Sequence, residues 1–105
     1  MSRTIKVGQQ ESGSTVAVAQ GDQVRLELPE TRTAGFRWQM VSPESPVFTV
    51  HDEGFAAAPG IGGTGLHRWT ITALGQGSAV LAMRYGRPWE SAATQEFMLT
   101  IEVRE

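Results

Sequence analysis

Short segments in which apolar and polar residues alternate recur along most of the chain, and they constrain its fold more than any other feature. The alternation is clearest at 23–28, 36–40, 69–73, 79–85 and 97–103. An amphipathic helix would instead need apolar residues three and four positions apart. Alternation with a period of two places one face of each strand in a core and the other in solvent. The sequence therefore predicts a β-strand over each of these segments.

Three further segments, 4–7, 14–19 and 47–51, show a weaker strand pattern, which gives about eight strands in all. Glycines and prolines between the segments mark turns. Many short strands separated by turn signals are typical of an antiparallel β-sandwich. A chain of 105 residues is long enough for one such unit. We therefore expect an all-β fold in which residues 1–105 form a single domain.

The composition excludes several classes of function. A net charge of −2 lacks the basic excess of a nucleic-acid-binding protein. No apolar run approaches the length of a membrane span, so we expect no membrane partner. The absence of cysteine excludes disulfides, thiol catalysis and thiolate metal sites. We expect a monomer, cytoplasmic as the sequence is written because 1–7 lacks the apolar stretch of a signal peptide, or periplasmic or secreted if a leader was removed.

Three irregular segments lie at one end of the expected sandwich. They are 29–35, 52–65 and 86–93, and Pro29 is expected to end the strand that precedes it. If successive strands run up and down, every second connection lies at the same end. The tight turns near 42–46 and 74–77 then lie at the opposite end. Sandwiches commonly bind partners through loops that are grouped in this way on a rigid scaffold.

The third of these segments carries the strongest candidate for a binding residue. Trp89 directly follows Pro88 and lies two residues after Arg87. Pro88 restricts the backbone and cannot donate to a strand ladder, so we expect Trp89 to lie exposed in a loop. Exposed Trp and Arg are strongly favoured at the energetic centres of interfaces. The alternative interpretation is that Trp89 folds back as a lid over the core.

The second segment is rich in glycine. Gly60, Gly62 and Gly63 surround Ile61. Three glycines in four residues allow a positive φ or a close approach of the backbone to a partner. The string alone also fits a flexible loop.

The first segment leads into a strand that carries two aromatic residues. Gly35 is expected to supply a special backbone dihedral before the strand begins. Phe36 and Trp38 share one face of that strand, and we expect both to pack in the core.

Nothing in the sequence points to catalysis. His67 is expected on the polar face of its strand, and Asp52 with Glu53 in a solvated loop. Neither His51 nor His67 has further ligands at metal-site spacing. No G-x-S-x-G motif or triad pattern is present. We therefore expect no enzymatic activity, no metal and no cofactor.

Taken in order, the three segments resemble the chagasin-type inhibitors of papain-like cysteine peptidases, the I42 family. Members carry an Asn-Pro-Thr-Thr-Gly-Tyr/Phe motif followed by x-Trp, then Gly-x-Gly-Gly, then Arg-Pro-Trp/Phe. The second motif is present in full at 60–63, and the third is present in full at 87–89. The resemblance extends from about Gly21 to the C-terminus.

The first motif is only partly kept. Four of its residues match, and three differ from the usual Asn, Pro and Thr. The matching residues are Thr33, Gly35, Phe36 and Trp38, and the departures are Thr31, Arg32 and Ala34. Arg32 is larger than the usual Pro and charged, so the departures are expected to bear on which peptidases are accepted.

The resemblance implies an immunoglobulin-like sandwich whose three loops enter the active-site cleft of a papain-like cysteine peptidase and inhibit it reversibly, without a covalent bond. It implies Trp89 as the main anchor, with Arg87 beside it and Pro88 fixing the approach. It places Thr33 and Gly35 nearest the catalytic thiol. The full implied binding set is Thr31, Arg32, Thr33, Ala34, Gly35, Phe36, Gly60, Ile61, Gly62, Gly63, Arg87, Pro88 and Trp89.

Two other hypotheses remain open. The first is a non-enzymatic immunoglobulin-like binding or adhesion module that uses Trp89 and Phe55 as platforms for a glycan. Trp38 and Trp69 are expected in the core, which disfavours a flat Trp-lined face. The second is an accessory domain whose exposed edge strand pairs with a partner.

Overall fold

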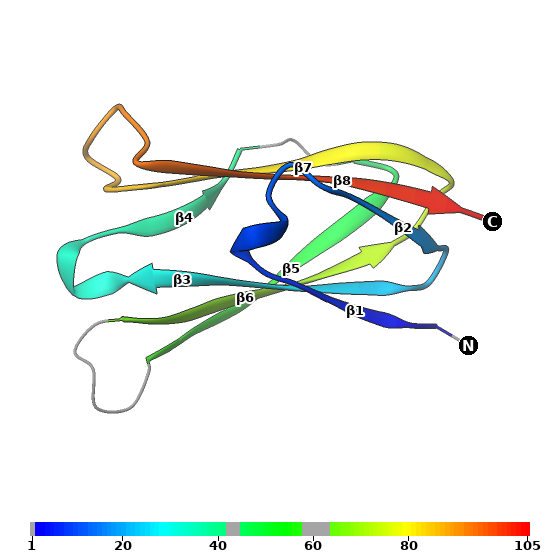
Figure 1. The fold of residues 1–105 in the computed structure, drawn as a ribbon, viewed down its shortest axis with the longest axis horizontal. Coiled ribbons are helices and arrows are strands. Elements are labelled where there is room, and N and C mark those ends of the chain that lie inside the picture. The colour runs from blue at the N-terminus through cyan, green and yellow to red at the C-terminus, as the bar shows by residue number, and fades with distance from the viewer. Residues whose placement is uncertain (1, 42–44, 58–63) are drawn as a thin grey trace.

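Two sheets of four strands pack face to face in the computed structural model, which describes residues 2–41, 45–57 and 64–105 (Figure 1). The expected all-β sandwich of about eight strands is confirmed. The first sheet has the order β1-β3-β6-β5 and the second β2-β8-β7-β4. The strands are β1 (Thr4–Val7), β2 (Thr15–Ala19), β3 (Gln23–Thr31), β4 (Arg37–Met40), β5 (Phe48–Ala57), β6 (Thr64–Ala73), β7 (Gly77–Gly86) and β8 (Gln95–Arg104), with short 3-10 helices η1 (Gln9–Glu11) and η2 (Arg32–Ala34).

Both sheets are mixed rather than wholly antiparallel. β1 pairs with β3, and β2 with β8, in parallel. The other described pairings, β3–β6, β5–β6, β4–β7 and β7–β8, are antiparallel as expected. Both parallel partners come from the N-terminal segment, whose two short strands join opposite sheets. Period-2 alternation reports which face of a strand is buried and not the direction of its neighbour, so the sequence pattern left this undetermined.

The core lies between the sheets and consists of the inward-facing residues of the alternating strands. Met40 departs from its strand's pattern, because its side chain is 38% exposed. Trp38 and Trp69 are buried, as expected. The most deeply buried apolar residues include Val24, Leu26, Leu28, Ile71, Leu81, Met83, Phe97, Leu99 and Ile101.

β3 continues through Pro29 to Thr31, so the expectation that Pro29 ends this strand is wrong. β1 pairs with β3 only as far as Leu26. Beyond that point one edge of β3 has no strand neighbour among the described residues, and a residue without an N–H is tolerated there. Pro29 still pairs with Leu66 of β6 on its other side. The alternation of β3 therefore continues to Thr31, three residues beyond the predicted end of this strand at position 28.

β5 continues to Ala57, and β6 begins at Thr64, so much of the loop expected at 52–65 is strand. A bulge lies between Asp52 and Gly54 in the pairing with β6. Gly54 has a φ of +96°, and its N–H donates to Oδ1 of Asp52 at 2.8 Å. An extra residue at a bulge reverses the alternation beyond it, which hid this half of the strand from pattern analysis.

The described parts of the three predicted binding segments lie near one end of the sandwich, as strand parity predicted. In Figure 1, η2, the β5–β6 end of the first sheet and the connection from β7 to β8 all lie on the left. The β2–β3 and β6–β7 turns and both chain termini lie toward the right. Within the described residues, no helix has the length and apolar character needed to cross a membrane.

Candidate functional site

The segment after β7 forms a tight turn that presents Trp89 to solvent. The N–H of Glu90 donates to the carbonyl oxygen of Arg87 at 2.9 Å. Pro88 and Trp89 therefore occupy the two central positions of the turn, the first of which favours proline. An ion pair of 3.8 Å between Arg87 and Glu90 spans the same turn. Trp89 is 73% exposed, which confirms the sequence expectation and excludes the lid over the core.

The exposed Trp89 ring rests against the first loop. A methyl group built on Gly35 would lie only 2.6 Å from Cη2 of Trp89. Gly35 follows η2 in the left-handed region, with a φ of +87°, and its N–H donates to the carbonyl oxygen of Arg32. Glycine is required here both by its dihedral and by the closeness of the indole. The contact braces the edge of the indole at Cη2, while most of Trp89 stays exposed.

A stack of aromatic side chains joins the exposed loops to the core. The Arg87 guanidinium lies 4.6 Å above the Phe36 ring, and Phe36 stacks on Tyr85 with centroids 5.3 Å apart. Tyr85 in turn contacts Trp38, with centroids 4.7 Å apart. Arg87 also donates from Nε to the carbonyl oxygen of Ala34 at 2.9 Å. The first and third loops are therefore a single packed unit rather than two independent loops.

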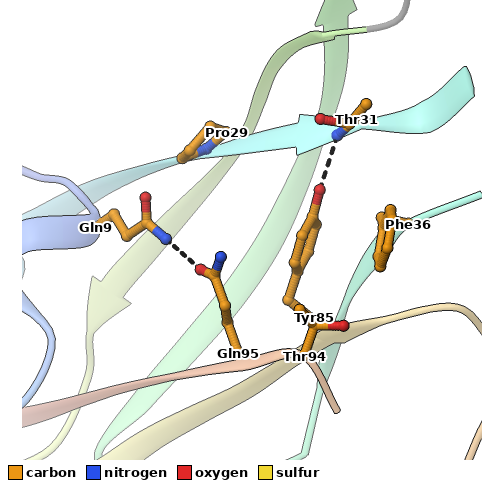
Figure 2. Close-up of a pocket in the computed structure, with 7 residues that line it drawn as sticks. All are labelled: Gln9, Pro29, Thr31, Phe36, Tyr85, Thr94 and Gln95. Carbon is orange, nitrogen blue, oxygen red and sulfur yellow. Dashed lines mark hydrogen bonds between the residues drawn. The ribbon is translucent and has the colours of Figure 1, made fainter. Parts of the chain in front are cut away.

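A recess of about 360 Å³ lies beside this stack, between the end of β3 and strands β7 and β8 (Figure 2). Its wall includes Phe36 and Tyr85, and the Tyr85 hydroxyl accepts a hydrogen bond from the N–H of Thr31 at 2.9 Å. Gln9 and Gln95 are hydrogen-bonded to each other on its other side. The hydroxyl thus holds the start of the first loop against the second sheet.

The first loop is short and internally bonded. Thr31 ends β3, and Arg32, Thr33 and Ala34 form η2. The Arg37 guanidinium donates from one nitrogen to the carbonyl oxygens of Phe36 and Arg32, at 2.9 and 3.3 Å. These bonds use polar groups that a loop of this length would otherwise leave to solvent. The backbone is therefore folded into a defined shape.

A buried carboxylate supports this loop from below. Glu30 is 0% exposed and lies on the inward face of β3. Its Oε1 accepts from Nε of Arg32 at 2.7 Å, and its Oε2 accepts from the N–H of Trp38 at 2.7 Å. The Arg32 guanidinium also lies 4.6 Å above the Phe55 ring of β5. Arg32, which replaces the usual Pro, is therefore held in place on two sides.

His67 extends this cluster across the first sheet to β5. Its Nδ1 lies 3.2 Å from both carboxylate oxygens of Glu30, and its Nε2 lies 2.6 Å from Oδ1 of Asp52. The imidazole stacks on Trp69 with centroids 4.0 Å apart. His67 is 5% exposed, so the expectation that it lies on the polar face is wrong. Asp52 is in β5 and contacts this histidine, whereas the sequence analysis placed it in a solvated loop.

The charge on Glu30 is stabilised despite its burial. Burial raises the pKa of this carboxyl, but the hydrogen bonds from Arg32, from the Trp38 backbone and from His67 together outweigh that effect. The pKa therefore lies below its ordinary value of 4.5. The carboxylate is ionised around neutral pH and attracts Arg32.

The cluster of Glu30, Arg32, His67 and Asp52 was not identified from the sequence, although a signal was present. Glu30 has the same parity as Leu26 and Leu28, and His67 has the same parity as Trp69. A titratable residue on the apolar face of an alternating strand is costly to bury unless it is paired. Some of the partners were hidden because they lie on other strands: Glu30 and His67 meet only through the β3–β6 pairing, and Asp52 lies in β5.

The described residues also bear on the other functional hypotheses. Among residues 2–41, 45–57 and 64–105, no group of three or more acidic or histidine side chains is arranged to hold a metal ion. Trp38 and Trp69 are buried and unavailable to a glycan. Phe55 is partly buried beneath Arg32 rather than displayed as a platform.

Comparison with known proteins agrees with this arrangement of loops. The profile of the family described as "Chagasin family peptidase inhibitor I42" matches residues 17–101. The chain belongs to the chagasin family of peptidase inhibitors. Chagasin of Trypanosoma cruzi is 28% identical over an alignment of 105 positions, which covers 94% of this chain and 96% of that protein.

Solved structures share the fold of this chagasin-family chain. The crystal structure of the cysteine protease inhibitor EhICP2 from Entamoeba histolytica aligns with a TM-score of 0.84 at 17% identity, over 97% of this chain and 96% of that one. The solution structure of amebosin aligns with a TM-score of 0.74 at 26% identity, over 99% of both chains. PbICP-C, solved in complex with falcipain-2, aligns with a TM-score of 0.71 at 12% identity, over 99% of this chain and 92% of that one.

Two of the three expected binding segments of this chagasin-family chain can be placed, and they are in direct contact. The first comprises Thr31 to Phe36, and the third Arg87 to Trp89. Phe36 is half-buried between Arg87 and Tyr85, so it supports the loops more than it extends from them. The second segment, Gly60, Ile61, Gly62 and Gly63, lies outside the described residues, and only the strands that flank it are seen.

Proposed function

We propose that this chain is a reversible, non-covalent inhibitor of papain-like cysteine peptidases that uses the loop-bearing end of the sandwich. One observation carries the proposal: Trp89 stands 73% exposed on a closed turn while its ring is braced by Gly35 of the first loop. A large aromatic side chain held in this way loses little conformational entropy when a partner covers it. The family assignment supports the choice of peptidase class, as does the likeness to PbICP-C, which was solved in complex with falcipain-2.

Inhibition requires that the loops enter a cleft without being cleaved. A substrate binds a peptidase as an extended strand, whereas η2, Gly35 and the turn at Arg87–Glu90 are compact and internally bonded. We infer that Thr33 and Gly35 lie nearest the catalytic thiol and that Trp89 fills a flanking wall. Residues 60–63 are assigned to the opposite wall, and one sandwich domain supplies the whole surface.

The absence of a catalytic role belongs to the same proposal. The titratable side chains of the loop-bearing end act on one another: Glu30 with Arg32 and His67, and Arg87 with Glu90. We infer that they shape a binding surface and perform no chemistry on the peptidase.

The test is a titration of the protein into papain and into a cathepsin L-type peptidase, followed with a fluorogenic peptide substrate. The proposal expects stoichiometric inhibition that is fully reversed on dilution, with the inhibitor recovered uncleaved. No inhibition at about 10 μM, equivalent to binding weaker than roughly −7 kcal/mol, would reject these peptidases as targets.

A further inference from the structure

The Glu30 carboxylate, which projects from β3, is hydrogen-bonded to both ends of the stretch from Arg32 to Trp38. Arg32 begins η2 and Trp38 lies in β4, and each donates to a different oxygen of Glu30 at 2.7 Å. The chain between these donors contains the residues expected nearest the catalytic thiol. A single buried group therefore sets the spacing between the points where the loop leaves the first sheet and enters the second.

The same carboxylate is linked to the edge of the first sheet. His67 contacts Glu30 through Nδ1 and Asp52 through Nε2. These contacts run from β5 through β6 to β3, and Arg32 continues them into the first loop and back over Phe55 of β5. The hairpin that leads into the second expected binding segment is thereby coupled to the first loop.

A buried ionised group of this kind is an inefficient way to stabilise a core. Removing a carboxylate from water costs several kcal/mol, and a well-packed apolar replacement for a buried ion pair is often as stable. A charged acceptor instead fixes where its donors lie, because charge-assisted hydrogen bonds are short and geometrically selective. Among the described residues no buried side-chain nitrogen or oxygen is left without a partner, so the cluster is complete as it stands.

We propose that Glu30 is the positioning residue of the inhibitory surface: its carboxylate holds Arg32 and the Trp38 backbone so that the first loop fits a peptidase cleft, and His67 links that loop to the β5–β6 hairpin. This inference rests on the proposed function. It gives Arg32 a structural role in addition to any contact with the peptidase: through Glu30, this residue helps to shape the first loop.

The first experiment measures papain inhibition by the variants Glu30→Gln and Arg32→Ala, singly and together. An amide keeps one acceptor oxygen, so Arg32 and the Trp38 N–H compete for it. Each single variant is expected to weaken inhibition roughly tenfold or more, as the loss of a hydrogen bond to a charged group does. Because both act through one contact, the double variant is expected to be no weaker than Glu30→Gln alone. If the double variant weakened inhibition by the product of the two single losses, the two residues would act independently and the proposal would be overturned.

Arg68→Ala is the matched control. Arg68 forms an ion pair with Glu27 between the same two strands, β6 and β3, but both side chains are partly exposed to solvent. Its removal is expected to leave inhibition unchanged. The conservative variant Arg32→Lys keeps a donor for Glu30 and is expected to recover most of the inhibition lost in Arg32→Ala. Failure of this rescue would mean that Arg32 acts through direct contact with the peptidase.

A measurement on the free protein separates this inference from the proposed function. Amide hydrogen exchange at Gly35 and Trp38 is expected to accelerate in Arg32→Ala and Glu30→Gln but not in Arg68→Ala. If the wild-type protein inhibits no peptidase, the proposed function fails while this result still decides whether Glu30 positions the loop. If Glu30→Gln does not fold, Arg32→Ala carries the test, and unchanged exchange at both amides would overturn the positioning role.

Discussion

At the scale of single residues, Trp89 and Gly35 show how an exposed aromatic side chain is kept ready for a partner. Trp89 is 73% exposed and would gain most of its burial only in a complex. Gly35 supplies both a positive φ and the missing methyl group that lets the indole approach. The two residues lie 54 positions apart in the sequence. Their contact converts two loops into one surface.

Trp89→Ala is expected to weaken inhibition by about 2 kcal/mol or more, because truncation of a central aromatic anchor removes most of its buried area. The thermal midpoint should not change, since this side chain is mostly exposed in the free protein. Inhibition constants for papain measure the first effect and calorimetry the second. Trp89→Phe, which keeps an aromatic ring, is the control and should retain most of the affinity. An unchanged constant for the alanine variant would remove Trp89 from its role as anchor.

Gly35→Ala is expected to reduce both stability and inhibition. An L-residue with this positive φ costs about 1–2 kcal/mol, and the added methyl group must displace the Trp89 ring. Gly21→Ala is a matched control, because Gly21 has a φ of +91° with nothing within 4 Å and lies in the β2–β3 turn at the opposite end. Denaturant titrations should show similar losses of stability for both variants. Only Gly35→Ala should weaken inhibition; equal inhibition by the two would contradict the Trp89 contact.

The exposed residues of the site are more predictable from the sequence than the buried ones. Trp89 and Gly35 are predictable because a proline restricts the local backbone and a glycine permits a positive φ, and both rules can be read from local sequence. Glu30 and His67 were missed because the stability of a buried charge depends on partners from other strands. Their role follows only from the strand register, which pairs Leu28 with His67 and Glu30 with Gly65.

At the scale of elements, the first and third loops are held together mainly by one side chain. Arg87 donates from Nε to the carbonyl oxygen of Ala34, stacks on Phe36 and lies 3.8 Å from Glu90. It therefore contacts the turn that carries Trp89 as well as the loop that carries Gly35. The relative position of the two loops depends on this guanidinium.

Arg87→Lys is expected to weaken inhibition by roughly tenfold while keeping the net charge. Lysine cannot reproduce the fork geometry that serves Ala34 and the Phe36 ring together. Amide exchange at Gly35 should also accelerate in the free protein, because the first loop loses its tie to the third. Arg104→Lys, whose guanidinium donates to Glu102 at the end of β8 away from the loops, is the control and should change neither measurement. Weaker inhibition with unchanged exchange would show that Arg87 acts on the peptidase directly.

The elements were predicted where alternation was continuous and misplaced where it was interrupted. The strands at 69–73, 79–85 and 97–103 lie inside β6, β7 and β8 as observed. The second half of β5 does not show as a strand in the sequence, because the bulge at Asp52 reverses its alternation. β3 continues past Pro29 because a proline ends a strand only where its missing N–H is needed for pairing, and here it is not. Whether a bulge forms in β5 and whether β3 continues past Pro29 depend on neighbouring strands, which the local sequence does not reveal.

At the scale of the whole molecule, a buried carboxylate stands at each end of β3. Asp22 precedes the strand and accepts hydrogen bonds from the backbone N–H groups of Ala19 and Arg3, which lower its pKa below the ordinary 3.8. Glu30 lies near the other end, and its pKa is also lowered. Asp22 closes the end where the N-terminal segment lies, and Glu30 supports the end that carries the first loop. Both ends of the sandwich therefore depend on an ionised carboxylate.

These two carboxylates predict that the protein loses stability in acid. Because each pKa is lower in the folded chain, the unfolded chain takes up more protons as the pH falls. The free energy of unfolding should therefore be level above about pH 4.5, decline as the pH falls through 4.5 and 3.8, and lose this contribution fully below the folded-state values. Urea titrations between about pH 7 and about pH 2 measure the curve. A wild-type stability that does not vary over this range would contradict the pairing at both ends.

Variants at the two ends separate stability from function. Asp22→Asn and Glu30→Gln are each expected to flatten part of the acid decline, because each removes one titrating group. At neutral pH both should lower stability, since an amide presents a donor where the folded chain already supplies donors. Only Glu30→Gln should weaken papain inhibition, because Asp22 lies at the end of the sandwich away from the loops. A loss of inhibition in Asp22→Asn at a temperature where it remains folded would mean that the loop-bearing end is not positioned locally, and that the whole sandwich determines the shape of the inhibitory surface.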